Sequence, residues 1–165
     1  MAIKQVGIVG CGQMGSGIAE VCARVGYIVV VSEADAALLN RGLASIEGSL
    51  ARAVSRGKMT EADKATTLKR ISGTSSVEWF KDCQLVIEAV VENMAEKRKV
   101  FAALDGACRK DAILVSNTSC LSVTEMAVAT KRPDKVLGIH FFNPVPVMKL
   151  VELVRTILTS EETIA

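Results

Sequence analysis

The only histidine of this chain, His140, opens a largely apolar segment that closes on the acidic residue Glu152. Imidazole is the one side chain whose unperturbed pKa lies near neutrality, and a carboxylate on one ring nitrogen can fix its tautomer. Such a pair could exchange a proton with a substrate at physiological pH. The competing interpretation is structural, because a single histidine beside Phe141 and Phe142 is more often a buried residue with a satisfied hydrogen bond.

A glycine motif near the N-terminus predicts a cofactor for this proton chemistry. The run Gly10-Cys11-Gly12-Gln13-Met14-Gly15 matches G-x-G-x-x-G, follows a short apolar run and precedes a helical pattern. Its glycines permit a tight turn and let the backbone approach a pyrophosphate, which then faces the N-terminal amides of the helix. The alternative is a glycine turn that packs a strand on a helix and binds no ligand.

The acidic residue that usually accompanies this motif is also present. Glu33 ends the next predicted strand, where a carboxylate accepts the ribose hydroxyls of the cofactor. A carboxylate there also repels the 2′-phosphate of NADP, although the neighbouring Ser32 could accommodate a phosphate. The loop and the carboxylate together favour NAD.

Hydrophobic periodicity predicts the elements that position these residues. We expect strands over Gln5–Val9, Tyr27–Val31, Gln84–Val90, Ala112–Ser116, Val136–Phe141 and Lys149–Val154. Helices are expected after the glycine loop, from Asp35 to about Gly57, from Thr60 to about Arg70, from Met94 to Cys108, and after Ser122 and Ser160. This alternation predicts one α/β domain, a Rossmann-like, doubly wound, mainly parallel sheet with a helical-hairpin insertion after the second strand.

Length and composition exclude several other classes of protein. The 165 residues are 50% hydrophobic with mean hydropathy +0.34, which predicts one globular domain. Twenty Lys and Arg against eighteen Asp and Glu give a net charge of +2, too balanced for a nucleic-acid-binding surface. No apolar stretch approaches the roughly 20 residues that a membrane span needs.

The cysteines indicate a reducing compartment. Five cysteines are an odd number, none forms a C-x-x-C pair, and one histidine is too few for the usual zinc patterns, so we expect no metal. The N-terminus also lacks a secretory signal pattern. We therefore expect reduced thiols and a cytoplasmic protein.

Four segments together resemble the 3-hydroxyacyl-CoA dehydrogenases, especially the bacterial 3-hydroxybutyryl-CoA dehydrogenases. They are residues 10–17, Leu85-Val86-Ile87-Glu88-Ala89-Val90-Val91-Glu92-Asn93, Ser116-Asn117-Thr118-Ser119, and the segment from His140 to Glu152. The resemblance covers the whole chain and implies an NAD-binding domain over residues 1–165. It also implies a helical dimerisation domain that would follow and that this chain lacks, so the family's homodimer and its catalytic asparagine would lie outside the sequence.

The resemblance implies roles for individual residues. His140 would be the general acid and base that interconverts a short-chain (S)-3-hydroxyacyl-CoA and its 3-keto form, with Glu152 orienting its ring and Ser119 binding the substrate oxygen. NAD contacts are implied for Ala89, Val90, Glu92, Lys97, Asn117, Ser119 and Asn143. The run Glu96-Lys97-Arg98-Lys99 could instead be a solvated face.

Two arginines of the predicted hairpin match positions where the family binds acyl-CoA. Arg52 and Arg56 are four residues apart on one helix face and could grip the CoA phosphates, although a solvated basic face is an equal alternative. The chain departs from the family in having Cys120 where a second serine is common and Glu33 where aspartate is common. Two other functions stay open: a dehydrogenase of a 3-hydroxy acid without CoA, and a non-catalytic protein that binds NAD.

Overall fold

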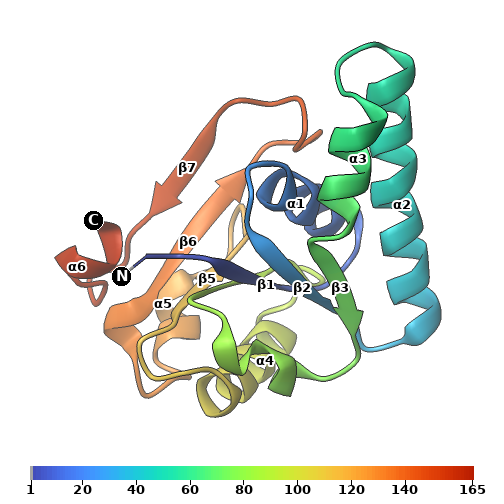
Figure 1. The fold of residues 1–165 in the computed structure, drawn as a ribbon. Coiled ribbons are helices and arrows are strands. Elements are labelled where there is room, and N and C mark those ends of the chain that lie inside the picture. The colour runs from blue at the N-terminus through green and yellow to red at the C-terminus, as the bar shows by residue number, and fades with distance from the viewer. Residues whose placement is uncertain (1) are drawn as a thin grey trace.

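The computed structural model describes residues 2–165, which form one seven-stranded sheet with helices on both faces (Figure 1). The strands are β1 (Gln5–Val9), β2 (Ile28–Ser32), β3 (Ile71–Thr74), β4 (Leu85–Glu88), β5 (Ile113–Ser116), β6 (Val136–Phe141) and β7 (Val151–Val154). They lie in the order β3-β2-β1-β4-β5-β6-β7, and every neighbouring pair is parallel except β6 and β7. The predicted doubly wound, mainly parallel sheet is confirmed.

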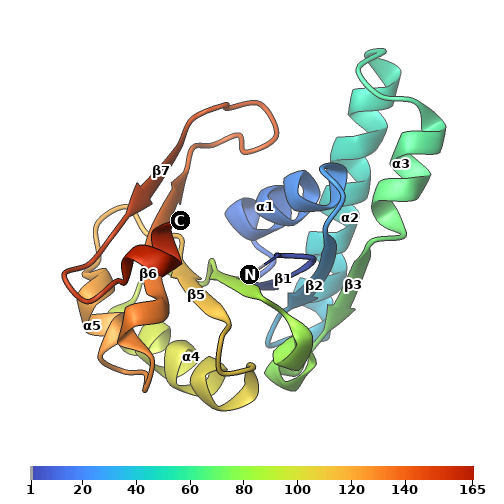
Figure 2. The same cartoon turned by 60° about the vertical axis from the view of Figure 1, so that its left-hand side comes forward.

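Two hydrophobic cores hold the helices to the sheet. The helices are α1 (Gln13–Arg24), α2 (Ala36–Ser55), α3 (Glu61–Leu68), α4 (Met94–Ala107), α5 (Val123–Ala127) and α6 (Glu161–Ile164), with 3-10 turns η1 (Val77–Asp82) and η2 (Pro133–Lys135). One core packs Ile18 of α1 and Leu50 of α2 on one face of the sheet. The other packs Phe80 of η1, Phe101 of α4 and Met126 of α5. Helices α4 and α5 lie on the opposite side of the sheet from α1 and α2 (Figure 2). Because both faces are covered, the inner strands are mainly apolar, and the polar residues of β1, β2, β4 and β5 stand at the strand ends.

The helix ends follow their sequence signals. Gly26 adopts a positive φ of 112° after α1, and the next amide, of Tyr27, donates to the Cys22 carbonyl as in a Schellman motif. Asp35 accepts hydrogen bonds from two amides of the first turn of α2. Thr60 and Asp63 form a capping box at α3. The predicted hairpin of α2 and α3 is confirmed.

The structure also contains elements that the periodicity did not predict. Strand β3 lies at the edge of the sheet and reads Ile-Ser-Gly-Thr, too short and polar to show an apolar pattern. It forms because it pairs with β2, and Gly73 leaves room for Leu39 and Leu43 of α2, which would lie 3.1 Å from a Cβ there. The turn η1 was also missed.

Several boundaries moved. Strand β2 starts one residue later than predicted, and β4, β5 and β7 are shorter; α3 ends at Leu68 rather than near Arg70, and α4 at Ala107 rather than Cys108. Across residues 2–165, none of the helices has the length and apolar character needed to cross a membrane.

Candidate functional site

The glycine loop joins β1 to α1 at the carboxyl end of the sheet. Gly10 has a φ of +93°, and a Cβ on Gly15 would lie 1.9 Å from the Gly10 carbonyl oxygen, so both positions require glycine. A Cβ on Gly12 would meet nothing within 4 Å. No side chain caps the start of α1 at Gly12, so the first-turn amides are available to an external acceptor. This donor set fits the pyrophosphate of a dinucleotide.

Glu33 lies beside the loop, as the sequence predicted. Its Oε2 accepts from the Cys11 amide at 2.9 Å and its Oε1 from the Ala34 amide at 2.9 Å, so the carboxylate is fixed in place. It borders a cavity of about 240 Å³ with Cys11, Gly12, Gln13, Ser16, Leu38, Arg41, Gly42 and Ser45. Burial, and then the charge of Glu33, raises the pKa of the Cys11 thiol to about 11. The thiol of Cys11 therefore stays neutral beside the loop where the phosphates of a dinucleotide would bind.

A second cavity, of about 380 Å³, gathers eight of the predicted site residues. It is lined by Met14, Ala89, Val90, Glu92, Asn117, Ser119, His140, Phe141, Phe142 and Asn143. These residues come from the glycine loop and from the carboxyl ends of β4, β5 and β6, where parallel sheets bind ligands. Because Gln13 borders the first cavity and Met14 the second, the two cavities flank the loop. This arrangement fits the two halves of a dinucleotide.

His140 and Glu152 meet across the one antiparallel strand pair. They are directly opposite in the register of β6 and β7, and His140 Nδ1 lies 2.8 Å from Glu152 Oε2. The imidazole packs on Phe142, with ring centroids 4.4 Å apart. With Nδ1 engaged, Nε2 is the ring nitrogen left to exchange a proton in the cavity. The histidine borders the cavity and its side chain is 27% exposed, so it is not buried in the core, although it has the hydrogen bond that the structural interpretation expects.

Lys97 and Glu92 belong to a network of charges beneath the second cavity. The Lys97 side chain is 0% exposed, and its Nζ lies 2.7 Å from Glu88 Oε1 and 3.3 Å from Glu92 Oε2. The Thr118 hydroxyl donates to Glu92. Burial acts to raise the pKa of Glu92, but the hydrogen bond from Thr118 and the charge of Lys97 outweigh it and lower that pKa. Glu92 is thus held ionised at the edge of the cavity.

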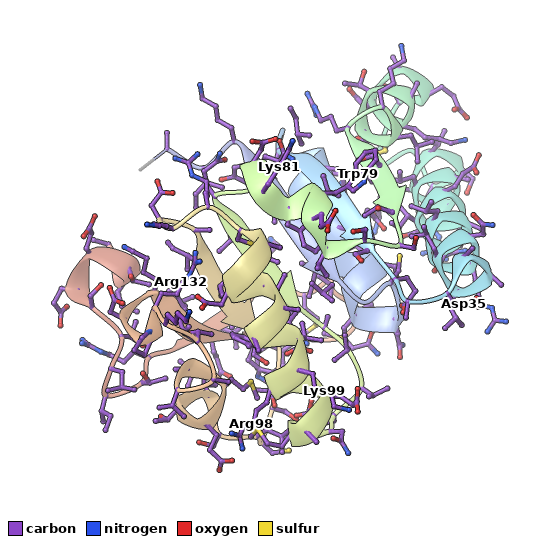
Figure 3. All side chains as sticks on the ribbon, turned by 90° about the horizontal axis from the view of Figure 1, so that it is seen from below. Asp35, Trp79, Lys81, Arg98, Lys99 and Arg132 are labelled. Carbon is purple, nitrogen blue, oxygen red and sulfur yellow. The ribbon has the colours of Figure 1, made fainter. Side chains whose placement is uncertain are left out.

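The alternative of a solvated charge run is wrong for Lys97 and correct for its neighbours. Arg98 and Lys99 are exposed on α4 (Figure 3), whereas Lys97 faces the sheet. The resemblance implies that Lys97 contacts NAD. This contact stays a prediction, because the Lys97 side chain is buried.

The family model for the 3-hydroxyacyl-CoA dehydrogenase NAD binding domain matches residues 5–165. The chain belongs to this family. The expectation of NAD as the cofactor is confirmed with it.

Individual members of the 3-hydroxyacyl-CoA dehydrogenase family are similar over the whole chain. A 3-hydroxybutyryl-CoA dehydrogenase of Mycobacterium tuberculosis is 53% identical over 99% of this chain and 58% of its own length, and a probable one of Bacillus subtilis is 46% identical over 99% and 57%. The crystal structure of M. tuberculosis FadB2 matches with a TM-score of 0.97 and 52% identity, covering 99% of this chain and 57% of that one. That of the Ralstonia eutropha (S)-3-hydroxybutyryl-CoA dehydrogenase matches with a TM-score of 0.96 and 47% identity, covering 98% and 57%. The chain spans under three fifths of these relatives.

The two arginines matched to acyl-CoA binding in the 3-hydroxyacyl-CoA dehydrogenases lie apart from both cavities. Arg52 is in the last turn of α2 and Arg56 caps its end, and both are exposed. The tip of the α2–α3 hairpin extends upward in Figure 1, as does the loop between β6 and β7. A role of Arg52 and Arg56 in binding acyl-CoA stays a prediction, and so does the alternative of a solvated basic face.

Residue-by-residue reasoning missed three members of the site. Thr118 and Glu88 take part in the network beneath the cavity, and Phe142 packs on the histidine. A signal for Glu88 was present, because an acidic residue closing a wholly apolar strand must be either buried with partners or turned towards a ligand.

Proposed function

We propose that this chain is the cofactor half of an NAD-dependent dehydrogenase that interconverts short-chain (S)-3-hydroxyacyl-CoA and 3-ketoacyl-CoA. The observation that carries the proposal is the 2.8 Å contact of His140 with Glu152 at the cavity that also holds Ser119 and Asn143. A histidine with one ring nitrogen held by a carboxylate is suited to move a proton at the other. The similarity to 3-hydroxybutyryl-CoA dehydrogenases supports the choice of substrate.

The cofactor supplies or accepts a hydride at substrate C3 when it is bound. In the direction of ketone reduction, His140 Nε2 donates a proton to the 3-keto oxygen; in oxidation, the same nitrogen accepts the proton of the 3-hydroxyl. Ser119, exposed at the turn after β5, donates a hydrogen bond to that oxygen. Glu152 holds the tautomer and stabilises the imidazolium that forms in oxidation.

The glycine loop and Glu33 provide the test of the cofactor assignment. Replacing Glu33 with Ala removes the acceptor for the ribose hydroxyls and the charge that repels a 2′-phosphate. We expect the dissociation constant for NADH to rise about tenfold and the preference over NADPH to shrink, measured by fluorescence titration of this chain. Unchanged affinities of the Glu33→Ala chain for NADH and NADPH would contradict the assignment of Glu33 to the cofactor site.

Acyl-CoA binding and assembly extend the proposal. Arg52 and Arg56 would contact the CoA phosphates, and a helical domain after this one would complete the cleft and form a homodimer. Exposed apolar side chains along β7 and after it support a further packing partner; Leu153 is 58% exposed and Ile157 93%. The five free cysteines agree with a cytoplasmic enzyme, which remains part of the proposal.

The deciding experiment follows the loss of NADH with acetoacetyl-CoA. It uses this chain alone and this chain fused to the C-terminal part of the M. tuberculosis relative, with acetoacetate as the substrate that lacks CoA. Turnover of acetoacetyl-CoA by the fusion protein supports the proposed reaction. A raised Michaelis constant for acetoacetyl-CoA in the Arg52→Ala/Arg56→Ala variant supports the proposed role of the two arginines. Equal turnover of acetoacetate would favour a dehydrogenase without CoA, and NADH binding with no turnover of either substrate would favour a non-catalytic protein.

A further inference from the structure

A network of hydrogen-bonded polar and charged side chains lies beneath the second cavity. We propose that Glu88, Lys97, Glu92 and Thr118 form a positioning network that holds the Ser119 turn, with Lys97 linking the two carboxylates. The proposal rests on the proposed function, because it takes Ser119 as a group that binds the reacting oxygen. It gives these four residues a role in the geometry of the site.

Glu88 is the fixed end of the network. It is the last residue of β4, it is 0% exposed, and its Oε2 accepts from the Ser116 hydroxyl at 2.6 Å. Its Oε1 accepts from the Val90 amide at 2.7 Å and from Lys97 Nζ at 2.7 Å. A buried carboxylate is tolerated only with such a full set of donors. The bond to Val90 sets the path of the backbone where it borders the cavity.

Thr118 is the other end. Its hydroxyl donates to Glu92 Oε1 and accepts from the Leu121 amide at 3.1 Å and the Cys120 amide at 3.4 Å. Thr118 precedes Ser119, and Cys120 and Leu121 follow it, so one hydroxyl closes the turn from both sides. Within residues 2–165 the Ser119 side chain makes no hydrogen bond, which leaves its hydroxyl free for a ligand in the cavity.

Lys97 couples the two ends. It lies between the two carboxylates and has no exposed surface, so a direct bond to a ligand would require the groups that cover it to move. The Glu92 side chain, by contrast, is 40% exposed and borders the cavity. The contacts therefore place Glu92 towards the ligand and Lys97 behind it.

The test removes the hydroxyl that links the network to the turn. Thr118→Val keeps the branched shape but loses the bonds to Glu92 and to the turn amides, whereas Thr118→Ser keeps them. Thr130→Val is the matched control, because the Thr130 hydroxyl also accepts from a backbone amide two residues on, that of Arg132, but lies outside both cavities.

Amide hydrogen exchange on this chain, without ligand, gives the first readout. We expect Thr118→Val to speed exchange at the Cys120 and Leu121 amides about tenfold, with Thr118→Ser near wild type and Thr130→Val changing only its own turn. Unchanged exchange at these two amides in Thr118→Val would overturn the proposal.

Activity of the fusion protein gives the second readout. We expect kcat of Thr118→Val with acetoacetyl-CoA to fall about tenfold, the NADH dissociation constant to change less than about twofold, and Thr118→Ser to restore kcat. An equal loss in Thr118→Ser, or in Thr130→Val, would reduce the network to a stabilising role and overturn the proposal. If wild type shows no turnover, the proposed function fails while the exchange result still decides whether the network holds the turn.

Discussion

Two pairs of a carboxylate and a nitrogen base lie within one site and differ in their surroundings. Glu88 and Lys97 are 2.7 Å apart with both side chains fully buried. His140 and Glu152 are 2.8 Å apart with side chains 27% and 54% exposed. Contact distance alone does not separate them. The exposure to solvent and to the cavity decides which pair can exchange a proton with a ligand.

The difference follows from the cost of changing charge. Removing a proton from Lys97 or adding one to Glu88 would leave the charge of the other group uncompensated in the buried network. At the exposed pair, water and substrate can take up the proton, and the ring nitrogen opposite Glu152 stays accessible. The buried pair therefore fixes positions, and the exposed pair carries out the proton transfer in the proposed function.

The largest expected effect comes from the exposed pair. His140→Gln keeps a polar side chain but removes the acid and base, so kcat of the fusion protein should fall by about 10³- to 10⁴-fold. The melting temperature should stay near that of wild type because the side chain is partly exposed. A loss of less than about tenfold would place the proton transfer on another group.

The next largest effect is on stability, at the buried pair. Lys97→Met leaves Glu88 buried beside one fewer donor, and the free energy of unfolding should fall by about 3–5 kcal/mol in urea titrations. Adding Glu88→Gln to this variant should recover part of the loss, because the unpaired charge is gone. A Lys97→Met chain as stable as wild type would mean that Glu88 is already neutral.

A smaller effect is expected at the second member of the exposed pair. Glu152→Gln keeps a hydrogen-bonding group opposite His140 but removes the charge that favours the imidazolium, so kcat should fall about 10- to 100-fold. Glu161→Gln, which alters an exposed pair with Arg155, serves as the control and should leave kcat unchanged. Equal losses in the two variants would contradict the orienting role of Glu152.

The smallest effect on the free energy of unfolding is expected for an ion pair that is exposed to water. Lys99 and Glu96 lie 2.8 Å apart on the outer side of α4, with side chains 72% and 51% exposed. Lys99→Met should change the free energy of unfolding by less than about 0.5 kcal/mol, measured in the same titrations as Lys97→Met. A cost near that of Lys97→Met would show that burial does not distinguish the two lysines.

The fold was largely predictable because its signals are local. Apolar runs, the glycine loop and the caps at Asp35 and Thr60 depend on residues close in the chain, and they gave the order of strands and helices. Strand β3 was not predicted because it pairs with β2 and packs against α2, and both elements lie far from it in sequence. The boundaries moved for the same reason, since pairing partners set where a strand ends.

The sequence alone determined the types of the reacting groups, the glycine loop and Glu33, and the resemblance tied them to one family. Only the tertiary structure decided which charges are usable. It placed Glu152 opposite His140 through the antiparallel pairing of β6 and β7, and it buried Lys97 although its neighbours in the same run are exposed. The sequence determines the charge and the spacing of these groups. Their solvation depends on the residues that pack around each of them, and solvation sets whether a proton can move.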